Sequence, residues 1–455
     1  MNNEQPDRVP IRLFVEEFAA KYAGRTNYEA ACDYRVAFDA TRKCVSELGC
    51  DAAMSNAIVN WMGMTKAIGW KAVTFPGLGL PLRSVTQWTE PVDEDGAFLK
   101  AGEYDEFSDD PTAFLMNAWL PRFTEHIHAP GEPVTFDHNM ALINGALSFL
   151  SYMGAFGKYA RLLRTEAGVV NASAGTLKAP LDILGDKLRG YLNLCYDLNE
   201  RHEKVKKACE ALMPHLLRSA LAGADPAGQV PVTIWMHRGG VPFVSRKDFE
   251  GIYWPTLRPI IEEIWAQGHQ VLFYAEGNWD AHLESFAELP DRSIIFHVDR
   301  SDIGKVRRAL GGRFCTSGGI PNDLLAIGTP ERVRARCREV MDTLARDGGY
   351  ILDASALIMD DAKVENVKAM VDASLDFGVY SQGSSSHLPK RVADTPHVGS
   401  GYRFAQSARQ PGVCVPWLEK RKEFPEITGD ENLARRAWEE VDSLGYSFLW
   451  TNLTW

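Results

Sequence analysis

The chain has 455 residues, of which 45% are hydrophobic, so it can bury a large core as one large α/β domain or as two smaller domains. Its 60 acidic and 49 basic residues give a net charge of −11, which argues against nucleic acid and anionic membranes as main partners. No stretch approaches the roughly 20 uninterrupted apolar residues of a membrane span.

The N-terminal residues and the cysteines indicate in which cellular compartment the protein is expected. The start, MNNEQPDRVPIRLF, lacks the basic and apolar regions of a signal peptide. The eight cysteines form no CxxC pair and no dense framework, which is typical of reduced thiols. We therefore expect a soluble cytoplasmic protein.

Short apolar runs that end in polar residues predict buried strands. They are VPIRLF (9–14), DAAMS (51–55), VTIWMH (232–237), QVLFYAE (270–276), SIIFHVD (293–299), RFCTS (313–317) and GYILDAS (349–355). An eighth strand is expected between about residues 136 and 172, where ALINGALSFLSYMGAFG is ambiguous between helix and strand. Amphipathic segments follow most of these runs. One of them, 330–349, has Thr329 as its N-cap and Pro330 in its first turn.

This alternation predicts a parallel sheet covered by helices, and eight such units close a (β/α)8 TIM barrel. The rival is an open doubly wound sheet, but no strand is followed by GxGxxG, so nothing supports a dinucleotide site. In a barrel, the active site lies at the C-terminal ends of the strands.

Two regions lie outside the repeating units. We expect a barrel domain over residues 1–380 with an inserted segment at about 76–135, which is rich in Pro, Gly and acids. Residues 381–455 form a C-terminal arm that either packs on a partner subunit or caps the barrel mouth. The long arm and its aromatic tail lead us to expect a homodimer.

Four strand-end residues are the candidate catalytic groups. Glu276 closes QVLFYAEG, and a carboxylate there is a metal ligand, a base or a solvated strand end. His237, which ends VTIWMH, either binds a metal, moves a proton or is satisfied within the core. Asp299 would complete a His237/Glu276/Asp299 metal site if it faces the mouth, whereas either Asp299 or Asp302 could instead cap the next helix. Tyr274 donates a proton, stacks on a ring or packs in the core.

Four further residues are candidates for substrate binding. Arg238 can hold a carboxylate or phosphate in bidentate fashion, or it can pair with a strand-end acid such as Glu276. His297 shares a strand face with Asp299, two residues on. Asp353 and Ser355 end the last strand.

The order of several motifs resembles the uroporphyrinogen decarboxylase superfamily. The stretch GGIPNDLLAIGTPERVRARCREVMDTLARDGGYIL, with VENV downstream, matches its C-terminal signature. Upstream, RVPIRLF, APLDILGDKLRGY, MHRGGVPFVSRKDFEGIYWPTLRPII and HVDRSDIGKVRRALGGRF follow in matching order, over roughly residues 8–380. The resemblance implies a (β/α)8 barrel, which agrees with the strand count.

The chain departs from both branches of this superfamily. The decarboxylases carry an arginine-rich RQAGR-type segment after the first strand, where this chain has FVEEFAAKYAG. A polyanionic porphyrinogen and true haem-pathway activity are therefore not expected. The methyltransferases hold zinc with H-x-C and a later Cys, and these positions fall on Tyr274-Ala275-Glu276 and Ala356. Only Glu276 among them can bind a metal, so the thiolate-rich zinc site is absent and any metal would prefer oxygen and nitrogen ligands.

We therefore expect an enzyme of the methyltransferase-like branch that transfers or removes a methyl group on a small molecule. Glu276 and His237 would act as ligands of a divalent metal such as zinc or as an acid–base pair. The resemblance also implies a corrinoid or another methyl carrier, with a corrinoid protein as a partner. The alternatives are a metal-free decarboxylase or lyase acting on a small aromatic or acidic substrate, and a barrel that binds a ligand without catalysis.

Overall fold

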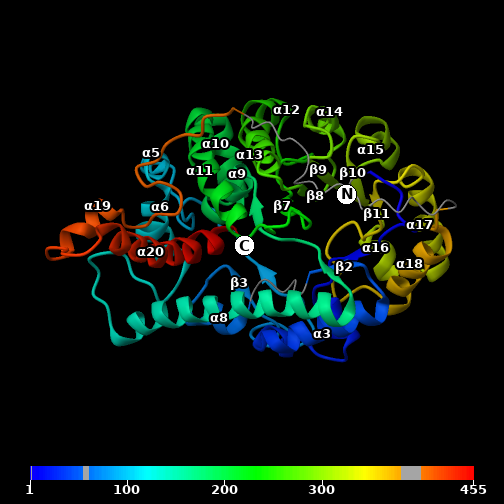
Figure 1. Ribbon diagram of the computed structural model, residues 1–455, viewed down its shortest axis with the longest axis horizontal. Coiled ribbons are helices and arrows are strands. Elements are labelled where there is room, and N and C mark those ends of the chain that lie inside the picture. Colours follow the sequence, from blue (N-terminus) through cyan, green and yellow to red (C-terminus); the bar gives the residue numbers. More distant parts are fainter. Residues whose placement is uncertain (2, 55–60, 381–400, 455) are drawn as a thin grey trace.

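The computed structural model describes residues 1, 3–54, 61–380 and 401–454. Parallel strands form its centre (Figure 1), in the orders β11-β10-β9-β8-β7-β6 and β1-β2-β5. Their bounds are β1 Arg12–Leu13, β2 Ala52–Ala53, β5 Val170–Asn171, β6 Thr176–Lys178, β7 Val232–Met236, β8 Val271–Ala275, β9 Ile294–Val298, β10 Cys315–Gly318 and β11 Tyr350–Ile351.

The two sheets are parts of one ring. β5 pairs with β2 and β6 pairs with β7, so these two short consecutive strands share one position. The bridges Ile11–Leu352 and Val15–Ile358 join the first strand segment to the last. With β5 and β6 counted together, the described strands occupy eight positions, which confirms the predicted (β/α)8 barrel.

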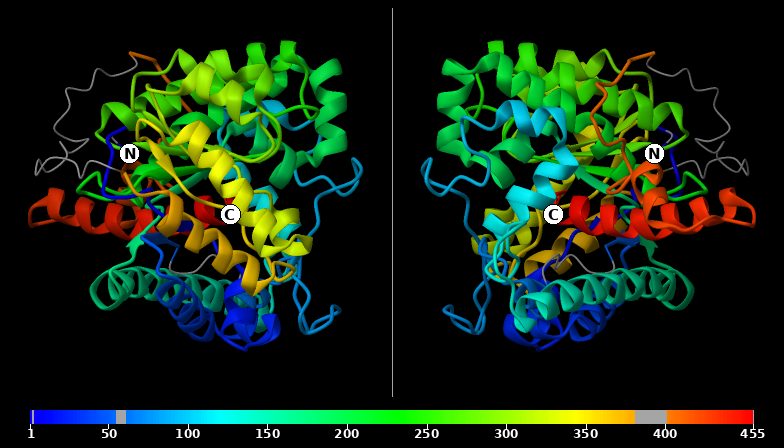
Figure 2. Two further views of the ribbon diagram at one scale, coloured as in Figure 1. Left: turned by 90° about the vertical axis from the view of Figure 1, so that its right-hand side faces the viewer. Right: turned by 90° about the vertical axis from the view of Figure 1, so that its left-hand side faces the viewer.

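Helices connect and surround the strands (Figures 1 and 2). They are α1 Glu17–Tyr22, α2 Asn27–Cys32, α3 Tyr34–Leu48, α4 Met62–Ile68, α9 Pro180–Ile183, η2 Leu184–Arg189, α10 Tyr191–Glu200, α11 His202–Ala222, α12 Arg246–Asp248, η3 Phe249–Tyr253, α13 Trp254–Ala266, η4 Asp280–His282, α14 Leu283–Ala287, α15 Ile303–Leu310, α16 Asn322–Ile327, α17 Pro330–Leu344 and α18 Val364–Phe377. The predicted N-cap of α17 is confirmed, because the Thr329 side chain accepts from the Arg332 N–H. Asp302, and not Asp299, caps α15.

The hydrophobic core has two layers, as a barrel requires. The larger layer lies between the strands and the helices. A smaller cluster fills the inside of the ring, where Phe14, Leu272, Tyr274, Ile295 and Cys315 pack together. The interior of the barrel is therefore a packed core. Burial of each such large side chain stabilises the fold by about 1.5–3 kcal/mol.

The region expected to be an insertion holds short elements and leads into one long helix. These are β3 Val73–Thr74, β4 Gln87–Trp88, α5 Tyr104–Asp109, α6 Pro111–Phe114, η1 Leu115–Trp119, α7 Leu120–Phe123 and α8 Phe136–Ala167. α8 resolves the ambiguous stretch as a helix. It begins at a capping box on Thr135 and ends at Gly168, whose φ is +69°. By length and composition alone α8 could cross a membrane, and 22% of its most apolar window is buried.

The C-terminal part contains α19 Trp417–Lys420, η6 Arg421–Glu423 and α20 Glu431–Thr454. The end of α20 packs on α11 of the same chain: Trp450 is fully buried and stacks on His215 at 4.5 Å. Residues 381–400 of the predicted arm lie outside the described residues. The division at residue 380 therefore stays a prediction.

Candidate active site at the strand ends

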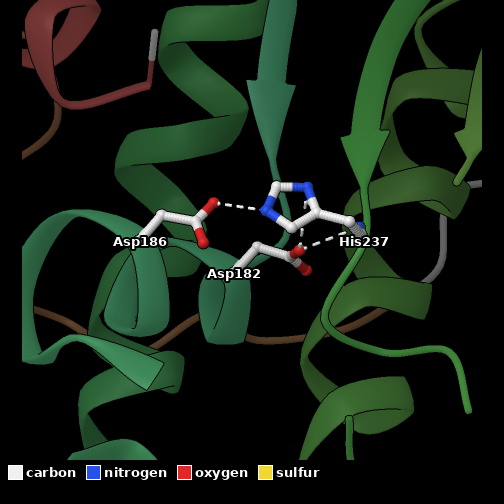
Figure 3. A group of neighbouring side chains, drawn as sticks. All are labelled: Asp182, Asp186 and His237. Carbon is white, nitrogen blue, oxygen red and sulfur yellow. Dashed lines mark hydrogen bonds and ion pairs between the residues drawn. The ribbon is translucent and has the colours of Figure 1, made fainter. Parts of the chain in front are cut away.

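Polar side chains follow four neighbouring strands at their C-terminal ends. Lys178 ends β6, His237 follows β7, Glu276 follows β8 and Asp299 follows β9. Two more acids come from the segment after β6, where Asp182 lies on α9 and Asp186 on η2. Figure 3 shows Asp182 and Asp186 pointing toward the His237 imidazole.

Asp186 is the centre of an ion-pair cluster. Its Oδ2 lies 2.5 Å from the Lys178 Nζ and 2.8 Å from the His237 Nε2, and its Oδ1 accepts from the Arg238 Nε at 3.0 Å. Burial alone would raise the pKa of Asp186, but these three cations outweigh it and hold the pKa well below its usual range. Asp186 is therefore a carboxylate across the ordinary pH range.

His237 and Arg238 balance the negative charge of Asp186. Burial alone would lower the pKa of His237, yet the Asp186 carboxylate outweighs it and the pKa is raised. Arg238 also donates to the Glu90 Oε1 at 3.0 Å, and its guanidinium lies 4.9 Å from the centre of the Tyr191 ring. Of the alternatives open for Arg238, the described residues therefore show salt bridges, made to Asp186 and Glu90 rather than to Glu276.

Asp182 fixes the loop that carries His237. The carboxylate is fully buried, and its Oδ1 accepts from the backbone N–H groups of His237 at 3.0 Å and Arg238 at 2.9 Å. Its Oδ2 accepts from the Tyr253 hydroxyl at 2.8 Å. Because both oxygens are satisfied, the loop after β7 is held rigidly and the imidazole has a defined place.

Glu276 differs from its neighbours because its carboxylate has no hydrogen bond or ion pair within the described part of the chain. Burial raises its pKa, and Asp299 and Asp186 add to the rise, against the opposing effect of His237 and Lys178. Burial also raises the pKa of Glu16, which follows β1, with Glu17 and Glu276 adding repulsion. The mouth therefore holds carboxyl groups that keep a proton to a higher pH than exposed ones do.

Asp299 shapes the turn beside Glu276. Its Oδ2 accepts from the Gly277 N–H at 2.7 Å, and Gly277 has a φ of +87°, which a residue with a side chain rarely adopts. Burial raises the pKa of Asp299, while the Gly277 hydrogen bond lowers it. Asp299 thus helps to position the residue that follows Glu276.

A second polar network lies inside the barrel. Arg12 on β1 donates to the Asp353 Oδ2 at 2.8 Å and to the Ser317 Oγ at 2.7 Å, and its Nη2 lies 3.1 Å from the His297 Nδ1. The His297 Nε2 lies 3.0 Å from the Ser355 carbonyl oxygen. Burial, with Arg12 adding to it, holds the pKa of His297 well below its usual range, so this imidazole is neutral.

Tyr274 connects this network to the mouth. Its ring stacks on His297 at 4.0 Å, and its buried hydroxyl has no hydrogen-bond partner among the described residues. Burial raises the pKa of Tyr274 well above its usual range, and Asp353 and Glu276 raise it further. The phenol is therefore protonated and free to donate.

The eight residues predicted from the sequence thus occupy two places. His237, Arg238, Glu276 and Asp299 lie at the mouth, whereas Tyr274, His297, Asp353 and Ser355 are fully buried beneath it. Their catalytic and substrate-binding roles stay predictions. Sequence reasoning did not single out Lys178, Asp182, Asp186 or Arg12, although Asp182 and Asp186 stand four residues apart in APLDILGD, a spacing that shares a helix face.

Three of these groups have the composition of a metal site. One ligand atom each from Asp182, Asp186 and His237 lies within 4.8 Å of the others. Two oxygens and one imidazole nitrogen are a set that divalent metals accept. Glu276 is not a member of this group; the sequence left it as either a metal ligand beside His237 or one half of an acid–base pair with it.

Comparisons with known proteins agree with this barrel. Residues 132–376 match the family model described as Uroporphyrinogen decarboxylase (URO-D). A uroporphyrinogen decarboxylase from Anaeromyxobacter dehalogenans (strain 2CP-C) is 29% identical over 178 residues, which are 39% of this chain and 48% of that protein. The match to this relative thus covers about half of the relative's length.

Solved structures are similar at the level of the fold. A methyltransferase from Methanosarcina mazei superposes with a TM-score of 0.51 at 14% identity, over 83% of this chain and 96% of that one. A B12-independent methionine synthase from Shewanella sp. W3-18-1 gives a TM-score of 0.42 at 10% identity, over 81% and 97%. The fold and the matched family model define a TIM-barrel protein. The chain belongs to the uroporphyrinogen decarboxylase family, which confirms the resemblance seen in its motifs.

Proposed function

We propose that this chain is an enzyme that removes a methyl group from a small methylated molecule, with Glu276 as the proton donor to the leaving group. The observation that carries the proposal is the Glu276 carboxyl, which lies at a strand end without a hydrogen bond or ion pair to any described residue and with a raised pKa. His237 and Asp186 would hold the neighbouring side of the substrate. Tyr274, whose hydroxyl has no hydrogen-bond partner among the described residues, would supply a further hydrogen bond.

The proposed reaction is a substitution at the methyl carbon. A nucleophilic acceptor forms a bond to the methyl carbon, the carbon–oxygen bond of a methyl ether breaks, and its electron pair goes to the oxygen. That oxygen takes the proton of Glu276, which leaves an alcohol or phenol. A corrinoid carrier, where bound, supplies the nucleophile. Protonation of the leaving oxygen typically contributes about a hundredfold to ten-thousandfold in rate.

The residues of the Asp182/Asp186/His237 group do not fit a divalent metal as they are placed. The Asp186 oxygens already face Lys178, His237 and Arg238, and both Asp182 oxygens accept hydrogen bonds. A metal would have to displace the Lys178 ammonium, 2.5 Å from Asp186, and deprotonate His237. The cluster is electrostatically complete with its own cations, so no step of the proposed reaction passes through a metal.

The charges at the mouth of the barrel determine which charge a substrate can carry. The nearby cations Lys178, Arg238 and Arg12 are each paired with a carboxylate. Glu16, Glu276 and Asp299 form no ion pair among the described residues. These three paired cations are not free to hold a polycarboxylate, and any ionised carboxyl at the mouth would repel it. The substrate we propose is therefore neutral or carries a single charge. The similarity in fold to a methyltransferase over 96% of its length is compatible with this reaction.

A carboxy-lyase is the second candidate, favoured by the match to the uroporphyrinogen decarboxylase family model and by the curated relative. In that reaction the carbon–carbon bond to the carboxylate breaks, carbon dioxide leaves, and the resulting carbanion takes the proton of Glu276. Both reactions use the same donor. Their products distinguish them.

The test is an assay of aryl methyl ethers with a reduced corrinoid acceptor, run beside the matching aryl carboxylic acids. We expect a free phenol from the ethers and a loss of about a hundredfold or more in kcat for Glu276→Gln, with partial recovery in Glu276→Asp. Release of carbon dioxide without phenol would replace demethylation by the lyase reaction. Full activity of Glu276→Gln in either assay would remove Glu276 as the donor.

A further inference from the structure

The exposed side of α8 carries an apolar stripe that nothing in the described chain covers. Phe136, Ile143, Leu147 and Leu150 are between 44% and 76% exposed. The opposite side of the helix packs on the protein: Gly145, Phe149 and Tyr152 are buried, and Tyr152 stacks on Phe38 of α3. α8 runs along the lower part of the molecule, beside α3 and away from the strands (Figures 1 and 2).

The stripe has the spacing of a helix-pairing seam. Positions 136, 140, 143, 147, 150, 154, 157 and 161 alternate steps of four and three residues. They run along the middle of the exposed side, opposite the buried residues. A repeat of this kind over 26 residues, about 38 Å from the first to the last, matches the packing of one helix against another. A fold-stabilising role does not explain it, because these side chains point away from the core.

We propose that this seam of α8 pairs antiparallel with α8 of a second copy of the chain, about a two-fold axis near residues 148 and 149. In this register the residue numbers of facing positions add to 297. Leu147 then meets the partner's Leu150, Ile143 meets the partner's Gly154, and Met140 meets the partner's Gly157. One surface serves both protomers, as a two-fold interface requires.

The two glycines support the register. A Cβ added at Gly154 meets nothing within 4 Å, and one at Gly157 meets only the tip of Arg161 at 3.9 Å. Nothing in the described part of the chain therefore requires glycine at these positions, although glycine disfavours a helix interior. In the proposed pair they lie opposite Ile143 and Met140, where a small residue lets the two helices approach.

The charges at the two ends of α8 are complementary in the same register. Asp137 lies in the first turn, and Lys158, Arg161 and Arg164 lie toward the other end. Asp137 and Arg161 form no ion pair within the described part of the chain. Antiparallel pairing brings Asp137 of each copy beside Arg161 of the other. A parallel pair would instead put like charges together.

An apolar groove extends the surface on one side of the stripe. It has a volume of about 480 Å³ between α8, η1 and α20, and Leu150 of the stripe also lines it, with Met116, Leu142 and Leu444. These last three are exposed in the single chain. The second copy would therefore cover a continuous apolar area rather than one row of side chains.

The first test is the mass of the full-length protein in solution by sedimentation equilibrium. We expect a dimer for the wild type and at least a hundredfold weaker association for Leu147→Lys, since two lysines would face the central leucines. The matched control is Leu192→Lys, at an exposed leucine on α10, which should leave the dimer intact. A monomeric wild type, or a dimer unchanged by Leu147→Lys, would overturn the proposal.

Cross-linking tests the direction of the pair. Oxidation of a mixture of Ile143→Cys and Gly154→Cys proteins should give a disulfide-linked dimer. Oxidation of Ile143→Cys alone should give no more disulfide-linked dimer than the wild type, because the two introduced cysteines lie roughly 16 Å apart along the helix axis. A strong homodimer band from Ile143→Cys alone would indicate a parallel pair. Charge reversal provides a second check: Asp137→Arg and Arg161→Asp should each weaken the dimer, and the double variant should restore it.

A lipid surface is the other occupant that the length and composition of α8 allow. Sedimentation with vesicles of phosphatidylcholine and phosphatidylglycerol separates the two. We expect the wild type to stay in the supernatant. If it pelleted with the vesicles, and Leu147→Lys did not, the seam would be a lipid-binding face and the proposal would fail.

Discussion

Asp186 determines the electrostatics of the strand-end cluster, because one carboxylate faces three cations. Its partners Lys178, His237 and Arg238 come from two strand ends and the following loop. The charge on Asp186 also raises the pKa of His237, which burial alone would lower. Removal of that one charge should therefore reverse the shift at His237.

The variant Asp186→Asn tests this directly. We expect the pKa of His237 to fall below its ordinary value, because burial and Lys178 are then opposed only by the smaller effect of Asp182. The ring proton signals of His237, followed by NMR over pH 4 to 9 and assigned with His237→Gln, measure the change. Glu250→Gln, at an exposed glutamate paired with Arg246, is the control and should leave the titration unmoved. A His237 titration that is the same in Asp186→Asn and in the wild type would contradict the cluster.

At the residue scale the sequence identified the strand-end acids and histidines but not their partners. Glu276 and His237 were visible because a polar residue ends an apolar run. Asp182 and Asp186 were not, since a short helix and a π-helical turn follow β6 and bring them back over His237. That return depends on three-dimensional packing. Arg12 looked like part of an ordinary strand, and only the closed ring shows that it points inward to Asp353.

At the scale of elements, the docking of α20 depends on one buried histidine. The His215 imidazole lies between two hydroxyls, 2.8 Å from the Tyr446 Oη and 3.0 Å from the Ser407 Oγ, and it stacks on Trp450. Burial lowers the pKa of His215 from 6.5 to about 3. The neutral ring is therefore required in the folded state.

Acid should release the end of α20. The unfolded state binds more protons between pH 6.5 and about 3, so the stability contributed by His215 is full above pH 6.5 and falls by about 1.4 kcal/mol per pH unit below it. Hydrogen exchange of the α20 amides at pH 7 and pH 5 measures this. We expect faster opening at pH 5, relative to α17, and a smaller pH effect in His215→Gln. Equal opening free energies of α20 at both pH values in the wild type would refute the assignment.

The sequence did not predict whether the segment that forms α8 is a helix or a strand. Its apolar positions recur on both the buried and the exposed sides, so the pattern did not distinguish a strand from a helix. The sequence pattern also did not show the third strand position of the barrel, which is divided between β5 and β6. Each piece has only two or three residues, too few for a periodic signal.

At the scale of the whole molecule, the Arg12–Asp353 pair ties the first and last strands together inside the ring. Both side chains are fully buried, and Ser317 and His297 lie beside the guanidinium. The barrel fold itself was predictable, because apolar runs and helices alternate along most of the chain. The pair that closes the ring was not, since its two residues are 341 positions apart.

Loss of one partner should destabilise the barrel strongly. We expect Asp353→Ala to lower the free energy of unfolding by about 3–5 kcal/mol, because Arg12 is left buried without its carboxylate. The double variant Arg12→Met with Asp353→Leu should recover much of this loss. Urea unfolding gives these values. Glu439→Gln, which breaks an exposed pair with Arg435, should change stability by less than about 0.5 kcal/mol. A loss from Asp353→Ala no larger than that would show that the buried pair does not hold the ring.

The central claim about the strand-end cluster is that the charges of the Asp182/Asp186/His237 group are balanced by Lys178 and Arg238, so that the group does not bind a divalent metal. The measurement that tests it most directly is elemental analysis of the wild type, purified without chelator, beside His237→Ala. We expect well under one equivalent of zinc or any other divalent metal in both proteins. One equivalent in the wild type that is lost in His237→Ala would contradict it, and the group would then be a metal centre.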